Sequence, residues 1–459
     1  MHLVNEMDSI IKESMPKLVN EFNTIVGFKF AMNSPTKAKE WFKQYYPWIE
    51  NMQAETMRDM FADPRPVPPH VRRALEIKDL AGSTSISKVK SVLDRVHFGR
   101  VYEVLAYHYT QTKRWSGRGP QIQNYPRPND KLQDSIKFDM NIHDLASYVR
   151  ERRPSLKDPI GFVKNLLRRM WLPNHGEQFY CGDFSKVEPT VLFWLVGLGP
   201  IPKKWYEEMA AEIYLTPVEQ ISKESEERQV GKTAALSCGY GAGWESFITK
   251  TYKDTGILLT EAMSKQVINA YRKKYPQVTK FWRDLEAGFR LAIHGQATQL
   301  CNGKIFISPM AYPFRGVQIR LPSGGMLYYH GAIERQEEFE DEMTEIRNGQ
   351  KVTFKVKKIR NVMKYMADQG GGRLAYDYVY GGLLCENVVS ATAREIIGPA
   401  VYHLESAGFD VLGLIHDETW ASAQAGREDE FNRLMCINPP WCPDLEIGSD
   451  LKTGVRYLK

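Results

Sequence analysis

Two short segments of strand-forming residues, separated by most of the middle of the chain, each lead to an acidic residue, and this pair constrains the fold more than any other feature. Residues 178–183 are aromatic and β-prone, and an apolar helical run follows them. The run VLGLI at 411–415 leads into the charged turn HDE at 416–418 and then into a second short strand, TWASA. Strands that end in this way can bring Asp183 and Asp417 together.

Asp183 and Asp417 are the residue type that holds hard cations. Mg²⁺ is usually bound in proteins by one or two carboxylates together with substrate phosphates. Two such ions, a few ångströms apart, can activate an attacking hydroxyl and stabilise a leaving group. Each acid taken singly also has a structural interpretation, which local pattern favours. Asp183 would complement the macrodipole of the following helix, and Asp417 would be a polar residue of a hairpin turn.

The rest of the chain mixes helices with a few antiparallel strands, which indicates the α+β class. The first ninety or so residues have a helical pattern, broken by the proline-rich DPRPVPPHVRR at 63–73. A later helix is predicted over 261–292, with Pro276 as a kink. Residues 299–360 combine β-prone segments with a highly charged insert, EEFEDEMTEIRNGQKVTFKVKKIR. At 459 residues the chain exceeds what one hydrophobic core usually serves, so two or three domains are expected.

The cysteine pattern and the apolar runs predict a cytoplasmic protein. The six cysteines are scattered singly without a C-x-x-C pair, which argues against a zinc site and against a disulfide framework. The N-terminal residues carry early acids and do not resemble a signal peptide. The longest apolar run, 191–201, is far shorter than the roughly 20 residues that a membrane span needs.

Positive charge is concentrated between residues 71 and 118. The chain has 61 Lys and Arg against 55 Asp and Glu, a net charge of +6. The segment holds only four acids, so its own excess equals that of the whole chain. Its ten cations are Arg72, Arg73, Lys78, Lys88, Lys90, Arg95, Arg100, Lys113, Arg114 and Arg118. Such a segment is either a solvated face or, beside the aromatic RWSGRGPQIQNYPRP, a surface for a phosphate backbone.

A helix predicted over 219–237 carries a further candidate set. Positions spaced by four residues form one slowly drifting stripe on a helix, and here they are Arg228, Lys232, Leu236 and Tyr240. Two cations, an apolar residue and an aromatic ring in a row suit a triphosphate at one end and a base at the other. The alternative is a solvated basic edge that passes into the core.

Glu188 has two interpretations. The segment SKVE at 185–188 fits the S-x-x-E capping box, in which Glu188 would be a reciprocal helix cap. The local pattern favours this cap. A functional Glu188 would instead line a sugar pocket beside Asp183.

Together these segments resemble the DNA polymerase I family (family A), and most of all its bacteriophage branch. DFSKVE at 183–188 is similar to the family's first catalytic motif, D-Y-S-x-I-E, and HDE at 416–418 matches its second carboxylate motif. TKRWSGRGPQIQNYPR at 112–127 resembles the T-G-R…Q-N-x-P segment that grips the primer–template. The fingers helix R-x3-K-x7-Y-G is matched by Arg228, Lys232, Tyr240 and Gly241. The resemblance runs from about residue 70 to the C-terminus, with the four motifs in the family's order.

The resemblance implies a right-hand polymerase fold, with a thumb, a palm built on a small antiparallel sheet, and helical fingers. Residues 1–100 would be a thumb-like helical region and 101–193 the first part of the palm. Residues 194–375 would be the fingers with the charged insert, and 376–459 the second part of the palm.

The implied activity is that of a template-directed DNA polymerase, which adds deoxynucleotides to a primer 3′-hydroxyl by two-metal-ion nucleotidyl transfer. Two Mg²⁺ ions are the expected cofactor, with Mn²⁺ as a substitute. The expected partners are primer–template DNA and deoxynucleoside triphosphates, with replication accessory proteins as further candidates. No membrane is expected to be involved. We expect a monomer, located in the host cytoplasm if the source is a phage.

The family's residue roles carry over position by position. The metal ions would be held by Asp183, Asp417, the Phe184 carbonyl and Glu418. Arg228 and Lys232 would bind the triphosphate, and Lys232 would protonate the leaving pyrophosphate. The nucleotide pocket would be completed by Leu236, Tyr240, Glu188 and His416, with Glu188 crowding the ribose 2′ position. The primer–template would be contacted by Arg114, Arg118, Gln123, Asn124 and Tyr240.

Several positions depart from the family pattern. Lys113 stands where the family usually has Gly, and Lys186 and Thr190 replace its usual Gln and Arg. Leu236 stands where the family has Phe or Tyr, so discrimination against dideoxynucleotides is expected to differ. Ser390 occupies the place of a frequent Gln, and we assign no template contact to it.

Proofreading is not expected on this chain. Family members with proofreading carry roughly 150 to 200 residues before the thumb, whereas only about a hundred precede Arg100 here. Two other functions share parts of the pattern. A single-subunit RNA polymerase is disfavoured by Glu188 and by the lack of a large promoter-binding region. A non-catalytic DNA-binding subunit is disfavoured because both carboxylates and both fingers-helix cations are intact.

Overall fold

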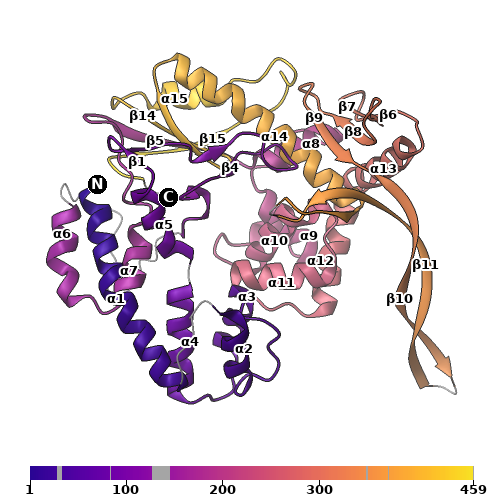
Figure 1. Cartoon of the computed structure of the whole chain (residues 1–459). Helices are drawn as coiled ribbons and strands as arrows, with labels where there is room; N and C mark the ends of the chain where they lie inside the picture. Colours follow the sequence, from indigo (N-terminus) through magenta and orange to yellow (C-terminus); the bar gives the residue numbers. More distant parts are fainter. Residues whose placement is uncertain (28–33, 83, 127–144, 348–349, 371, 458–459) are drawn as a thin grey trace.

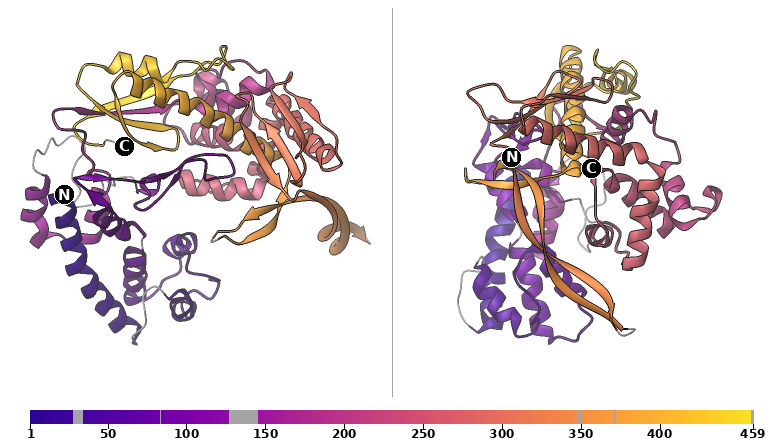
Figure 2. Two further views of the ribbon diagram at one scale, coloured as in Figure 1. Left: turned by 45° about the horizontal axis from the view of Figure 1, so that its top comes forward. Right: turned by 90° about the vertical axis from the view of Figure 1, so that its right-hand side faces the viewer.

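Helices and small antiparallel sheets make up the chain, which confirms the α+β prediction (Figure 1). The computed structural model describes residues 1–27, 34–82, 84–126, 145–347, 350–370 and 372–457. One helical group, which contains the N-terminus, and a second group, which contains α9–α12, lie on opposite sides of the molecule, with a β-sheet above them in Figures 1 and 2. None of the helices in these ranges combines the length and the apolar character of a membrane span.

The N-terminal group is helical, as predicted. Its helices are α1 (His2–Val26), α2 (Pro35–Lys43), α3 (Ala54–Ala62), α4 (Pro69–Gly82), α5 (Thr84–Leu93), α6 (Leu145–Arg152) and α7 (Pro159–Leu166). The proline-rich stretch ends at Pro69, the first residue of α4, where the missing N–H of proline costs no hydrogen bond. Phe22, Phe42 and Tyr46 are almost fully buried in the core of α1–α4.

A four-stranded antiparallel sheet brings the two predicted strand segments together. Its order is β13 (Asp410–Ile415), β14 (Glu418–Ala423), β5 (Gln178–Phe184), β15 (Ser449–Gly454). Because side chains alternate along a strand, the two faces of β5 pack into different cores. Phe179 and Cys181 join the core of the N-terminal helices, whereas Tyr180 and Phe184 join the main core.

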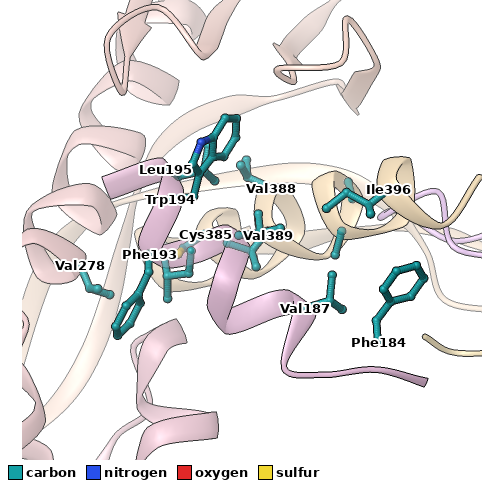
Figure 3. Close-up of a cluster of buried hydrophobic side chains, with 14 of the residues drawn as sticks. Phe184, Val187, Phe193, Trp194, Leu195, Val278, Cys385, Val388, Val389 and Ile396 are labelled. Carbon is teal, nitrogen blue, oxygen red and sulfur yellow. The ribbon is translucent and has the colours of Figure 1, made fainter. Parts of the chain in front are cut away.

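The main core lies between this sheet and the helices that cover it. These helices are α8 (Val187–Val196), α14 (Gly381–Ser406) and α15 (Glu428–Met435). In Figure 3, Phe193 of α8 lies beside Cys385 of α14, while Val187, at the start of α8, lies near Phe184; all four residues belong to one core. This packing fixes the direction of the chain immediately after Asp183.

The second helical group differs from the sequence prediction at two points. Its helices are α9 (Trp205–Tyr214), α10 (Glu226–Ser237), α11 (Trp244–Thr255), α12 (Glu261–Lys274) and α13 (Pro276–Ile293). The helix predicted from residue 219 begins only at Glu226, because Ser225 caps it by accepting a hydrogen bond from the Arg228 N–H. Pro276 does not kink one long helix. It is the first residue of a separate helix.

The charged insert forms a long two-stranded ribbon. Strands β10 (Ile333–Arg347) and β11 (Gln350–Asp368) pair in register, and β12 (Leu374–Val379) pairs with the C-terminal end of β11. The ribbon projects well beyond the body of the protein (Figures 1 and 2). Acidic residues of β10 face basic residues of β11 in ion pairs such as Glu338–Lys357 and Glu340–Lys355.

The remaining strands are short and antiparallel. A second four-stranded sheet contains β6 (Thr298–Leu300), β7 (Ile305–Pro309), β8 (Gly316–Arg320) and β9 (Met326–His330). Two small hairpins precede the main sheet, and they consist of β1 (Val96–His97), β2 (Arg100–Val101), β3 (Leu105–Ala106) and β4 (Ser116–Gly117).

Candidate active site

The two predicted carboxylates lie at the same end of the main sheet. Asp183 is the penultimate residue of β5, and Asp417 lies in the tight turn between β13 and β14. The Phe184 N–H donates to the Asp417 carbonyl at 3.2 Å, and Asp183 is opposite Glu418 in the register. Hydrogen bonding of the two strands therefore holds Asp183 and Asp417 side by side, as the sequence predicted.

A third carboxylate, Asp450, lies at the same sheet end and was not identified from the sequence. It pairs with Asp183 from the other side of β5, and it accepts a hydrogen bond from Ser185 Oγ at 2.8 Å. Directly opposed residues share a face of an antiparallel sheet, so Asp450, Asp183 and Glu418 project to one side. The available signal was an acid at the start of the short C-terminal strand, which is too common a pattern to single out.

Glu418 is turned into the protein rather than toward solvent. Its side chain is almost fully buried, and Oε1 accepts a hydrogen bond from Trp420 Nε1 at 2.6 Å. The predicted metal-site residues thus divide into two partly exposed acids, Asp183 and Asp417, and a buried acid that supports their turn.

Asp183 and Asp417 are the candidate residues for holding a cation. Across the parts of the chain that the structure describes, no group of three or more His, Cys, Asp and Glu side chains has the arrangement of a metal site. Two carboxylates fit Mg²⁺ when phosphates and water supply the remaining ligands. The donor set is therefore suited to an ion that binds together with a phosphate-bearing substrate.

His416 lies between a cation and two acids. Desolvation by the surrounding atoms lowers the pKa of His416 below its usual value, and Arg114 acts in the same direction. Asp183 and Glu418 oppose this shift. The imidazole is therefore neutral at pH 7 and can accept or donate a hydrogen bond without adding positive charge.

Glu188 does not cap its helix, so that interpretation was wrong. Lys186 is the N-cap of α8, in the left-handed region with φ +55°, and it makes no side-chain capping bond. The Glu188 carboxylate instead forms an ion pair with Arg114. It also accepts hydrogen bonds from Ser390 Oγ at 2.8 Å and from the Tyr240 hydroxyl at 3.4 Å. Burial raises the pKa of Tyr240 well above its ordinary value, so its hydroxyl remains a donor.

The contact with Glu188 also places Arg114. This arginine, predicted to contact the primer–template, lies beside the predicted nucleotide-pocket residues Glu188 and Tyr240. Ser390, at the position left without a role, is part of the same cluster. Residues from three distant segments are thus brought together around one carboxylate.

The cations of α10 gather around an aromatic ring that the sequence analysis missed. Lys186, Arg228 and Lys232 lie 5.1, 5.5 and 5.8 Å from the centroid of the Tyr206 ring, at the start of α9. Arg228 Nε also donates to Glu207 Oε1 at 2.5 Å. Desolvation raises the pKa of Tyr206, while Arg228 opposes the shift. Three cations around one neutral phenol form a surface that favours an anion, with the charge of Arg228 partly offset by Glu207.

Leu236 is the third residue of the stripe predicted on this helix, one turn after Lys232. Its side chain is 37% exposed, and the next residue of the stripe is Tyr240, which is partly buried and lies in the turn that follows α10. The stripe therefore passes from cations through an open apolar position to an aromatic ring, as predicted.

The predicted primer–template segment is tied to the end of the main sheet. Gln123 Nε2 donates to the Leu414 carbonyl at 3.3 Å, and Asn124 Nδ2 donates to Gln121 Oε1 at 3.3 Å. Lys88 Nζ donates to the Asn124 carbonyl at 2.5 Å, and burial lowers the pKa of Lys88 to about 8. The bond from Gln123 attaches the segment to β13, the strand that leads to Asp417, and the other two bonds fix the backbone around Asn124.

Two further positions of this segment are explained by their backbone and exposure. Lys113 has φ +59°, in the left-handed region, which accounts for the glycine usual in the family. Arg118 is exposed, and its guanidinium lies 5.8 Å from the centroid of the Tyr109 ring. Arg127, which ends the motif, lies outside the described residues.

Much of the positive charge between residues 71 and 118 is already engaged within the protein. Arg73 pairs with Glu21, and Arg100 pairs with Asp410. The other engaged or buried cations of this segment are Arg72, Lys78, Lys88 and Arg114. The net excess therefore overstates the charge that the segment can offer to a nucleic acid.

Comparisons with known proteins place the chain in a family. The family model for DNA polymerase family A matches residues 1–311. The chain is 27% identical over 431 residues to the DNA polymerase of Bacillus phage SP02, an alignment that covers 91% of this chain and 62% of the phage protein. It is similar in fold to the polymerase domain of Pol1 from M. smegmatis, solved with DNA primer–template and dNTP, with a TM-score of 0.57 and 12% identity, over 99% of this chain and 66% of that one. The chain thus spans less than two thirds of the length of either protein. With its family model matched over most of its length, the chain belongs to DNA polymerase family A.

Proposed function

We propose that the chain is a DNA-directed DNA polymerase that extends a primer 3′-hydroxyl by nucleotidyl transfer. The observation that carries the proposal is the turn at 183–188, which contributes to three sites at once. Asp183 stands with Asp417 at the sheet end, Lys186 joins the cations around Tyr206, and Glu188 joins Arg114 and Tyr240. One turn therefore connects a carboxylate pair, a cationic surface and an aromatic pocket.

Asp183 and Asp417 would hold two Mg²⁺ ions, or Mn²⁺ in their place, with the Phe184 carbonyl as a further ligand and Glu418 as a support. The bound ions would activate the attacking hydroxyl and neutralise the leaving group. Lys186, Arg228 and Lys232 would bind the triphosphate, with the neutral Tyr206 hydroxyl as a further donor. Lys232 would donate a proton to the leaving pyrophosphate. The chain's contribution is largely positioning and charge complementarity.

The remaining residues would select the substrate and hold the nucleic acid. Glu188 would occupy the space of a ribose 2′-hydroxyl, while Tyr240 stacks on the nascent base pair. His416 would support the primer terminus, and Arg114, Arg118, Gln123 and Asn124 would hold the primer–template near the sheet.

The predicted subdivision fits this proposal. Residues 1–100 would be the thumb, 101–193 and 376–459 the palm, and 194–375 the fingers. We infer that the chain acts on primer–template DNA and deoxynucleoside triphosphates as a monomer in the host cytoplasm, with replication accessory proteins as candidate partners.

Primer extension in the presence of Mg²⁺ tests the proposal. The chain is expected to extend a DNA primer with deoxynucleotides in a template-dependent manner. Ribonucleotides should be used at least about a hundredfold less efficiently, measured as kcat/KM. Template-independent addition would contradict the proposal. Efficient use of ribonucleotides would favour the RNA polymerase alternative, and DNA binding without extension would favour the non-catalytic DNA-binding subunit.

Leu236 provides a separate prediction about the sugar pocket. Replacing Leu236 by Tyr should change the ratio of dideoxynucleotide to deoxynucleotide incorporation by about tenfold or more, because a phenol would then face the incoming sugar. The ratio is measured by competition on one template. The control is Leu258→Tyr, at a leucine that is 74% exposed and lies outside the stripe. An unchanged ratio in Leu236→Tyr would show that Leu236 does not line the nucleotide pocket.

A further inference from the structure

The sheet at the base of the ribbon displays a row of exposed aromatic side chains for which the proposed reaction has no use. Tyr376 and Tyr378 lie on β12, and Tyr380 continues the extended backbone into the N-cap of α14. Their exposed fractions are 44%, 43% and 51%. Alternate residues of a strand share a face, so the three rings follow one another along one edge strand.

The opposite face of the same sheet is fixed to the body of the protein. Met363 and Val379 are directly paired, and both are buried in the main core together with Tyr365. The tyrosine row therefore faces away from the core.

The row begins beside the candidate active site. A Cβ atom on Gly382 would lie 2.3 Å from the Tyr240 carbonyl oxygen and 3.0 Å from the Tyr380 ring, so Gly382 is packed between these two tyrosines. A cavity of about 340 Å³ opens here, and it is lined by Arg272, Trp282, Arg283, Glu286, Tyr380 and Gly382, among others. The Arg272 guanidinium lies 5.9 Å from the centroid of the Trp282 ring. The cavity therefore combines arginines with aromatic rings, and Gly382 connects it to Tyr240.

Further along the ribbon, cations lie over aromatic rings on the face of the tyrosine row. Lys364 Nζ is 4.0 Å from the centroid of the Tyr378 ring, and the Arg360 guanidinium is 5.6 Å from that of Phe339. These cations also pair with Glu337 and Asp341, so the face is close to neutral. A nucleic acid on this face would be held mainly by stacking on the rings. Its phosphates would be bound by Arg272 and Arg283 of the cavity.

We propose that this surface, Tyr380, Tyr378 and Tyr376 together with the cavity, binds the unpaired template strand ahead of the insertion site. Rings two residues apart on a strand are separated by roughly 6.6 Å, which allows one base to stack on each ring. Proteins bind single-stranded DNA by combining cationic grooves with such aromatic platforms. The inference rests on the proposed function, because Tyr240 marks where the template would leave the duplex.

Binding of primer–templates with different 5′ overhangs tests the inference. Fluorescence anisotropy is used to compare an overhang of about two nucleotides with one of about ten. The long overhang should bind at least about fivefold more tightly to the wild type. Tyr376→Ala combined with Tyr378→Ala should abolish this gain.

Two control variants separate stacking from local structure. Tyr378→Phe loses the hydrogen bond to Glu337 but keeps the ring, and it should keep the overhang-dependent gain. Tyr402→Ala removes an aromatic side chain that is 70% exposed at the far end of α14, and it should also keep the gain. As a direct probe, 5-iododeoxyuridine in the overhang should photo-cross-link to the peptide that contains residues 374–380.

The outcomes for this inference and for the proposed function can be told apart. If the wild type extends the primer on the short overhang but binds both overhangs equally, the inference is overturned and the polymerase proposal stands. Loss of the gain in Tyr378→Phe, or cross-links only outside residues 374–380, would also overturn it. If the wild type extends neither substrate, the polymerase proposal is overturned, and the inference that rests on it is overturned with it.

Discussion

Replacing Asp183 or Asp417 by Asn should reduce primer extension by at least about a thousandfold. The affinity for primer–template should change by less than about threefold. Each substitution keeps the size of the side chain and the backbone pairing of β5 with β14, but it removes one of the two negative charges that the proposed ions require. Single-turnover extension gives the rate, and anisotropy with labelled primer–template gives the affinity.

Asp410 and Asp450 provide matched controls for this experiment. Asp410 lies at the other end of β13, where it pairs with Arg100 on the surface, so Asp410→Asn should change the rate by less than about twofold. Asp450→Asn should have an intermediate effect, because Asp450 lies opposite Asp183 and holds Ser185. A rate for Asp183→Asn within tenfold of the wild type would exclude the proposed carboxylate pair.

The strands that carry these acids were predictable because their pattern is local. A short apolar run, a charged turn and a second β-prone run define β13 and β14 from a few residues, and the structure confirms both strands. Pairing with β5 followed from the assumption that the acids converge. Asp450 could not be found in this way, because its place beside β5 depends on the C-terminal strand adding to the sheet, a long-range event.

The misassignment of Glu188 shows why local pattern fails at a site. A capping box needs only residues 185–188, and the sequence satisfies it. In the structure, Arg114 and Ser390 supply stronger partners from distant segments, and Ser185 turns to Asp450 instead. Tertiary hydrogen bonds and an ion pair override a cap worth about 1 kcal/mol.

The start of α10 was missed although the sequence carries a local signal for it, whereas Tyr206 was missed because its role depends on distant segments. Ser225 is a clear N-cap in the sequence, so the start of α10 could have been placed by its capping bond. Tyr206 offers no such signal, because its importance comes from three cations on two other segments. The charged insert was visible as composition, whereas its shape as a ribbon comes from the antiparallel pairing of β10 with β11, which composition does not reveal.

Glu188 is held in a way that makes its volume a fixed part of the site. The carboxylate has partners on three sides, namely Arg114, Ser390 and the Tyr240 hydroxyl. These contacts restrain the side chain. In the proposed function, Glu188 would therefore act as a fixed wall of the sugar pocket.

Replacing Glu188 by Ala should raise the efficiency of ribonucleotide relative to deoxynucleotide incorporation by about 10- to 100-fold. Removal of the carboxylate opens space beside Tyr240, and a 2′-hydroxyl can then approach Arg114 and Ser390. The ratio of kcat/KM values for matched ribo- and deoxynucleotides measures the change. Glu188→Gln is the control, since it keeps the volume and the acceptor for Ser390 and should keep most of the discrimination. If Glu188→Ala discriminates as strongly as the wild type, the carboxylate does not border the sugar, and the cluster serves only to join α8 to α14.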